Sequence, residues 1–353
     1  MKNNAGFNKN NLDLLRLILA VYVFLFHISA LTNIATFTVF GLYLSPHFAV
    51  RSFFVISGLL IYRSYTRSSS VASYFDKRFR RIYPAYFSVI VISAIALFPL
   101  SSLPFLKYFG LDFCRYVGAN LLFLNFLAPS LPGLFTTANI SSVNGALWTL
   151  KIEVAFYLFV PLMHFLSLRL GTKKVIGTIF IFSYAWKFGF AFLGAIARSS
   201  DIHPIDQRNM FEKLEVQFPA QLVYFCAGIL LLLFFDKLRQ HFRSISCISA
   251  CLFLIDHWFM GGNLDVLWIS GFVFVFGFWG YMGNFSKYGD FSYGVYIVHW
   301  PILQTMIAFG LATHNPYIFL LLSIFLVGSA SILMWNLVER RFLMSSSHYT
   351  VGP

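Results

Sequence analysis

Arg16 and His27 are the first residues in the chain whose types and spacing suggest chemistry, because both lie in one apolar run. Eleven helical steps correspond to a rise of about 16 Å and a net rotation of about 20°, so both side chains should share one face. Such a face could bind an anionic group through the arginine and place its reactive end beside the histidine. The alternative is an interfacial arginine and a hydrogen-bonded interior histidine. Because Arg16 and His27 are expected on one face of the helix, the functional interpretation is favoured for this pair.

A basic cluster begins the third long apolar segment. Its four cationic residues are Lys77, Arg78, Arg80 and Arg81. A guanidinium-rich patch suits phosphate groups and could bind a nucleotide-like donor. A juxtamembrane basic cluster also binds anionic lipid, so the cluster alone supports both interpretations equally.

Glu153 lies in a later apolar segment, where a carboxylate needs a partner or a water-filled cavity. A pair with His27 would make the imidazole a better base. The alternative is a structural ion pair, with Lys151 or Lys187 as the partner.

Two further signals are weaker. His299 stands close to a proline in an apolar segment, and its position alone favours a structural histidine. Ser57 and Gly58 end another apolar motif, and small residues of this kind usually allow close helix packing.

The composition shows which elements must position these residues. Charged residues are 11% of the 353 residues, against about 25% in soluble domains, and hydrophobic residues are 58%. Apolar runs of about 20 residues recur along the chain, which predicts an all-α, polytopic membrane bundle. No CxxC pair, P-loop or plausible metal cluster is present, so neither a metal nor a permanently bound cofactor is expected.

About ten transmembrane helices are predicted. They lie near 12–32, 48–65, 82–100, 146–168, 174–196, 216–236, 243–260, 264–282, 291–311 and 317–337. The short run 113–128 is an eleventh candidate. If this run does not cross, most of the 26 Lys and Arg residues lie inside, both termini are cytoplasmic and 101–145 is on the outer side. This sidedness also explains the net charge of +13 without a nucleic-acid partner.

Six segments in order resemble the membrane acyltransferase 3 family, over nearly the whole chain. They are Leu12–Arg16 with His27, Phe53–Gly58, Arg78–Pro84, Leu147–Leu150 with Glu153, Ser292–Pro301, and Val338–Arg340. Each motif is weak alone, and the ordered set is specific. Two positions depart from the family pattern: Arg51 stands where many members are acidic, and Lys151 lies inside the glutamate motif. Either departure could reflect a preference for the acceptor.

The resemblance implies roles for matching residues. His27 would be the catalytic histidine, supported by Glu153. The residues implied for the acyl-CoA donor are Arg16, Arg78, Arg80 and Arg81. The residues implied to contact substrate or support the site are Asp13, Ser57, Gly58, Trp148, Tyr157 and His299.

The function implied is an O-acetyltransferase that moves an acyl group, most simply acetyl, from cytoplasmic acyl-CoA to a hydroxyl of a surface glycan. O-antigen, lipopolysaccharide, exopolysaccharide or a lipid-linked sugar would be the acceptor, at a bacterial inner membrane among membrane lipids. A glycolipid or acyl-group transporter without chemistry and a structural lipid-binding protein remain as alternatives. The resemblance predicts a single transmembrane domain over 1–344, a short tail over 345–353 and no SGNH domain.

Overall fold

The structure, a computed structural model, describes residues 7, 9–199, 210–211 and 213–344. The described residues form helices and turns and contain no strand, which confirms the all-α prediction. The predicted tail 345–353 lies outside the described residues.

The helices follow the predicted apolar segments closely. The first half contains α2 (Leu12–Thr32), α3 (Thr38–Tyr43), α4 (Pro46–Thr66), α5 (Val71–Ala96), α6 (Phe105–Tyr108), α7 (Leu111–Leu121) and α8 (Trp148–Leu170). The second half contains α9 (Thr172–Ser199), α11 (Phe218–Leu233), α12 (Phe235–Gln240), α13 (Phe242–Ile255), α14 (Asp265–Phe278), α15 (Phe291–Ala308), α16 (Leu311–His314), α17 (Pro316–Met334) and α18 (Arg340–Phe342). Short helical turns include η3 (Gly145–Leu147) and the π-helical η6 (Trp335–Glu339).

Within the described residues, seven helices are long and apolar enough to cross a membrane. An eighth span arises if α4 and the helical segment Ala35–Tyr43 before it, bent by 43°, form one crossing. α14 has 14 residues, or about 21 Å of rise against a hydrocarbon core of about 30 Å. α7 has 11 residues, which agrees with the prediction that 113–128 does not cross. The chain is therefore an integral membrane protein, while ten spans and cytoplasmic termini stay predictions.

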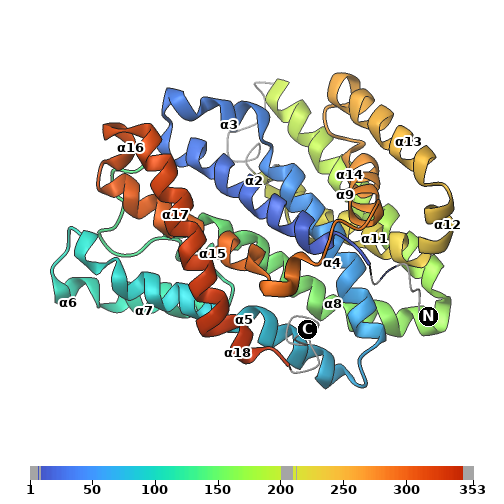
Figure 1. The fold of residues 1–353 in the computed structure, drawn as a ribbon, viewed down its shortest axis with the longest axis horizontal. Helices are drawn as coiled ribbons and strands as arrows, with labels where there is room; N and C mark the ends of the chain where they lie inside the picture. The colour runs from blue at the N-terminus through green and yellow to red at the C-terminus, as the bar shows by residue number, and fades with distance from the viewer. Residues whose placement is uncertain (1–6, 8, 200–209, 212, 345–353) are drawn as a thin grey trace. The chain divides into compact units, whose positions relative to one another are not determined.

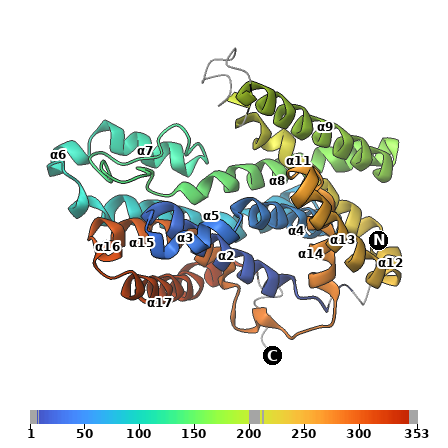
Figure 2. The ribbon, with the colours of Figure 1, turned by 90° about the horizontal axis from the view of Figure 1, so that it is seen from above.

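The chain divides into two compact units. Unit 1 contains Met1–Leu12, Val50–Tyr74 and Ile152–Met282, and unit 2 contains Asp13–Ala49, Phe75–Lys151 and Gly283–Pro353. In unit 1, α11 packs against α9 and α14, and α13 packs against α14 (Figure 2). In unit 2, α15 packs along α17 (Figure 1). Every residue of α15 from Ser292 to Pro301 is buried, as expected of a helix that is apolar all round.

A proline inside α8 shows how this fold satisfies backbone groups in an apolar setting. Pro161 cannot donate the helical hydrogen bond to the carbonyl of Tyr157. The hydroxyl of Tyr74 donates to that carbonyl at 3.2 Å instead. The freed acceptor is therefore paired, as buried backbone groups must be in a membrane protein.

Gly58 and Gly228 let α4 and α11 approach closely in unit 1. A Cβ added at Gly58 would lie 1.9 Å from the carbonyl oxygen of Phe225, and one at Gly228 would lie 2.0 Å from that of Val55. Small residues at such contacts allow two helix backbones to pack directly against each other, without side chains between them. Gly58 thus shapes unit 1 through helix packing.

Gly58→Ala is expected to destabilise the protein by about 1–3 kcal/mol, because the methyl group must push two backbones apart. Thermal unfolding in detergent micelles would measure the loss. Gly177→Ala on α9 is the matched control, since nothing lies within 4 Å of a Cβ there. Equal melting temperatures for the two variants would contradict a tight α4–α11 contact.

Candidate active site

The beginning of α15 is fixed by Asp290. One carboxylate oxygen, Oδ1, accepts hydrogen bonds from the backbone N–H and the hydroxyl of Ser292, so Asp290 caps the helix. The preceding Gly289 has φ +133°, and a Cβ there would lie 2.4 Å from the indole nitrogen of Trp335. Only glycine can adopt this backbone conformation so close to the indole ring of Trp335. This contact therefore fixes the direction in which the chain enters the cap at Asp290.

The other oxygen of Asp290 binds two arginines of different helices. Arg16 of α2 donates to Oδ2 at 2.6 Å, and Arg81 of α5 forms a second ion pair with the same oxygen. Arg81 also donates to Glu339 at 3.0 Å. The side chains of Asp290 and Glu339 are 2% and 1% exposed. Two arginines and two acidic side chains thus form a buried network that ties α2, α5, α15 and η6 together.

Asp290 remains ionised in this network. Burial by itself would raise the pKa of its carboxyl group, but the guanidinium groups of Arg16 and Arg81 and the hydrogen bonds from Ser292 outweigh burial. The pKa of Asp290 therefore lies well below its usual value. Asp13, one turn before Arg16, lies 3.9 Å from the same guanidinium and belongs to the edge of the network.

His27 forms a pair with His299. Nδ1 of His27 lies 2.8 Å from Nε2 of His299, and the rings are stacked with centroids 5.1 Å apart. His299 is fully buried, whereas His27 is only partly covered. The rings of Trp300 and His27 form a T-shaped contact with centroids 4.7 Å apart. His299 is thus both a buried interior residue and the partner of the predicted catalytic histidine.

The hydrogen-bond chain through this pair fixes the protons on neutral rings. Nδ1 of His299 lies 3.0 Å from the carbonyl oxygen of Val295, which can only accept, so this nitrogen carries the proton. Nε2 of His299 is then an acceptor and receives the Nδ1–H of His27. The remaining nitrogen of His27, Nε2, therefore has a lone pair available to accept a proton or to attack a carbonyl.

Arg16 and His27 both contact α15, Arg16 at its cap and His27 within it. This agrees with the common face expected from their spacing on α2.

A segment before α8 supports the helix that carries His299. Pro301 leaves the carbonyl of Ile297 without its helical donor, and the side-chain amide of Asn144 donates to this carbonyl at 2.8 Å. The hydroxyl groups of Tyr296 and Thr149 are 2.7 Å apart. The turn of α15 that precedes Pro301 is therefore stabilised by specific polar contacts.

The predicted donor arginines have different surroundings. Arg81 lies in the network, and Arg78, three residues earlier on the same helix, is partly buried. Arg80 is exposed and pairs with Asp76 at 2.8 Å, one turn away. The structure therefore brings Arg16 and Arg81 together and places Arg80 in a separate surface pair.

Several predicted site residues lie in other contacts. Glu153 belongs to unit 1 and accepts a hydrogen bond from Tyr157 at 2.7 Å, so its pairing with His27 stays a prediction. Trp148 begins α8 in unit 2 and is partly buried. Ser57 precedes Gly58 on α4 in unit 1 and is also partly buried.

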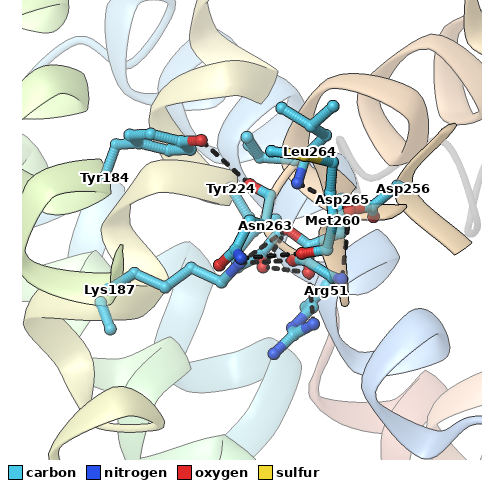
Figure 3. Close-up of polar contacts among 12 residues, drawn as sticks. Arg51, Tyr184, Lys187, Tyr224, Asp256, Met260, Asn263, Leu264 and Asp265 are labelled. Carbon is cyan, nitrogen blue, oxygen red and sulfur yellow. Dashed lines mark hydrogen bonds and ion pairs between the residues drawn. The ribbon is translucent and has the colours of Figure 1, made fainter. Parts of the chain in front are cut away.

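A second ionic cluster is buried in unit 1 (Figure 3). Lys187 donates to Asp265 at 2.8 Å, Arg51 forms an ion pair with the same carboxylate, and the hydroxyl of Tyr224 lies 2.7 and 2.8 Å from its two oxygens. Arg51, at the position that departs from the family pattern, is thus paired within its own unit and shares this carboxylate with Lys187. Lys187, one of the two lysines predicted as possible partners of Glu153, binds Asp265 instead.

Three carboxylates escaped the sequence-based site prediction: Asp265, Asp290 and Glu339. Asp290 had a local signal, because an Asp just before an apolar helix is a typical N-cap. Glu339 belongs to the Val338–Arg340 motif, and the sequence predicts no role for it there. Among the described residues, no group of three or more His, Cys, Asp or Glu residues could hold a metal ion.

Comparisons with known proteins show the family of the chain. An acyltransferase domain, that of the acyltransferase 3 family, matches residues 9–335. Nodulation protein 10 of Rhizobium leguminosarum bv. viciae is 26% identical over 87% of this chain and 86% of its own length. The O-acetyl transferase of Shigella phage Sf6 is 28% identical over 96% of this chain and 97% of its own length. No solved structure matches. The chain belongs to the acyltransferase 3 family and is an integral membrane acyltransferase.

Proposed function

We propose that the protein is an O-acetyltransferase that moves an acetyl group from acyl-CoA to a hydroxyl of a glycan sugar, with His27 as the catalytic residue. The observation that carries the proposal is the hydrogen-bond chain from Val295 through His299 to His27, which leaves Nε2 of His27 available. The full-length similarity to an O-acetyl transferase supports the acetyl group.

Two chemical roles fit this nitrogen. In the first, Nε2 attacks the thioester carbonyl, the C–S bond breaks and CoA leaves as thiolate; the sugar hydroxyl then attacks the acyl-imidazole, and its proton passes to the thiolate. In the second, Nε2 accepts the hydroxyl proton while the sugar oxygen attacks the thioester directly, and the proton then passes to the thiolate. Both roles give the same ester and the same free thiol.

The donor would be held by cationic side chains. Arg16 and Arg81 are oriented by Asp290, and a guanidinium group presents its N–H donors in a fixed planar fork. The phosphate groups of acyl-CoA suit such donors. Arg78, on the same helix as Arg81, and Arg80, at the surface of that helix, would contribute further donors. We place the reaction in a bacterial inner membrane, with an O-antigen, exopolysaccharide or lipid-linked sugar as acceptor.

The test is transfer of radiolabel from acetyl-CoA in membranes that contain wild type, His27→Ala or His241→Ala. His241 is exposed in unit 1 and serves as the control. Alkali-labile label should appear in the glycolipid and polysaccharide fraction with wild type and the control. His27→Ala should reduce it by about 10²–10⁴-fold.

Equal transfer by wild type and His27→Ala, at equal protein levels, would remove His27 from the chemistry. Movement of a glycolipid across the membrane without ester formation would favour the transporter alternative. If wild type gives no label from acetyl-CoA, the same assay with succinyl-CoA decides whether another acyl group is used.

A further inference from the structure

A cavity of about 390 Å³ lies in unit 1 and takes no part in the site around His27. Its volume falls in the range of small-ligand pockets. The lining residues are Phe7, Arg63, Arg67, Lys173, Leu232, Leu233, Phe234, Phe235, Asp236 and Lys237. All of them belong to unit 1.

Three separate chain segments contribute the cations of this pocket. Arg63 lies in the last turn of α4 and Arg67 directly after this helix, Lys173 lies at the start of α9, and Lys237 lies on α12, which follows α11. The sidedness predicted from the sequence places these three connections on the cytoplasmic side. The cationic side chains of these three connections line one pocket, as expected if the connections lie on the same side of the helix bundle.

The lining carries four cationic side chains and one carboxylate, Asp236. Aromatic rings orient two of these cations. The guanidinium carbon of Arg63 lies 3.7 Å from the ring centroid of Phe7, and Nζ of Lys173 lies 5.1 Å from that of Phe234. Phe7 is itself buried at 2% exposure, so this wall of the pocket is firmly packed.

We propose that this pocket binds a phosphate-bearing anion. Arginine and lysine around an aromatic wall match the charge and the acceptor-rich surface of a phosphate group. Basic pockets between transmembrane helices on the cytoplasmic side characteristically take phosphorylated lipid headgroups. The same chemistry would accept the phosphates of a soluble nucleotide. The proposal is independent of acyl transfer, because no lining residue belongs to the His27 site.

The experiment uses the purified full chain in nanodiscs and a matched pair of double variants. Lys173→Gln with Lys237→Gln removes two lining cations, both on exposed side chains whose loss should not affect folding. Lys174→Gln with Arg239→Gln removes two exposed cations on the same helices, α9 and α12, that do not line the pocket. Melting temperatures would confirm that both variants are folded.

Two binding measurements distinguish the sources of phosphate. The first measures how much radiolabelled phosphatidic acid stays with the protein after it is extracted from the phosphatidylcholine nanodiscs into detergent and washed. The second measures binding of radiolabelled adenosine 3′,5′-bisphosphate, with inorganic pyrophosphate as competitor. We expect the lining variant to weaken at least one of these by about tenfold and the control variant to leave both within about twofold.

A loss confined to the first measurement identifies a lipid headgroup, and a loss confined to the second identifies a soluble phosphate ligand. Equal binding by wild type and both variants would overturn the proposal. So would the absence of phosphate binding by wild type in both measurements.

Discussion

Asp290→Ala is expected to cost about 3–5 kcal/mol of folding free energy, because it leaves the guanidinium groups of Arg16 and Arg81 without their shared carboxylate in a buried setting. It also removes the N-cap of α15, the helix that carries His299. Unfolding in mixed detergent micelles would measure the loss. Acyl transfer should fall with it, since α15 positions the histidine pair.

Asp76→Ala is the matched control for this change. Asp76 pairs with Arg80 on the exposed surface of α5, with side chains 43% and 45% exposed. An exposed pair one helical turn apart contributes only about 0.3–0.5 kcal/mol. Similar losses for Asp76→Ala and Asp290→Ala would contradict the central position given to Asp290.

The pH dependence of this contribution follows from the depressed pKa of Asp290. A carboxyl group with a lowered folded pKa stabilises the protein above its unfolded pKa of about 3.9, and this stabilisation is lost as the pH falls toward the folded pKa. The contribution of the Asp290 carboxylate to the stability gap between wild type and Asp290→Asn should therefore be fully present at about pH 5. It should shrink below about pH 4.

His299→Phe is expected to lower kcat for acyl transfer by about 100-fold while KM for acyl-CoA changes by less than about twofold. Phenylalanine keeps the ring volume but cannot accept the Nδ1–H of His27, so the proton on His27 is no longer fixed to that nitrogen. The buried ring also leaves the carbonyl of Val295 without its side-chain donor. The effect should therefore appear in the chemical step.

His299→Gln separates positioning from packing. The glutamine amide offers an acceptor for His27 and a donor for Val295, so this variant should retain more activity than His299→Phe. His241→Phe, at an exposed position, should behave as wild type. A parallel rise of KM, or equal activity of the Gln and Phe variants, would show that His299 acts only through packing. A His27→Ala, His299→Phe double variant should be no worse than His27→Ala alone.

The helices themselves could be predicted from the sequence for a direct physical reason. In lipid every backbone polar group must be paired within the segment, so long apolar runs must be helical. The run beginning at Leu12 accordingly forms α2 over Leu12–Thr32, close to the predicted 12–32. The common face of Arg16 and His27 follows from the helical period alone. The composition likewise predicted a membrane protein, and the ordered motifs predicted its family.

The partners of these residues were decided by tertiary structure. Arg16 and Asp290 are 274 positions apart, and His27 and His299 are 272 apart, so no local period relates them. The basic cluster shows the same limit at short range, because its composition does not reveal that Arg81 enters the buried network while Arg80 stays at the surface. His299 by position alone suggested a structural histidine. Only the tertiary structure shows that His299, through its hydrogen bonds with Val295 and His27, also fixes the proton on His27.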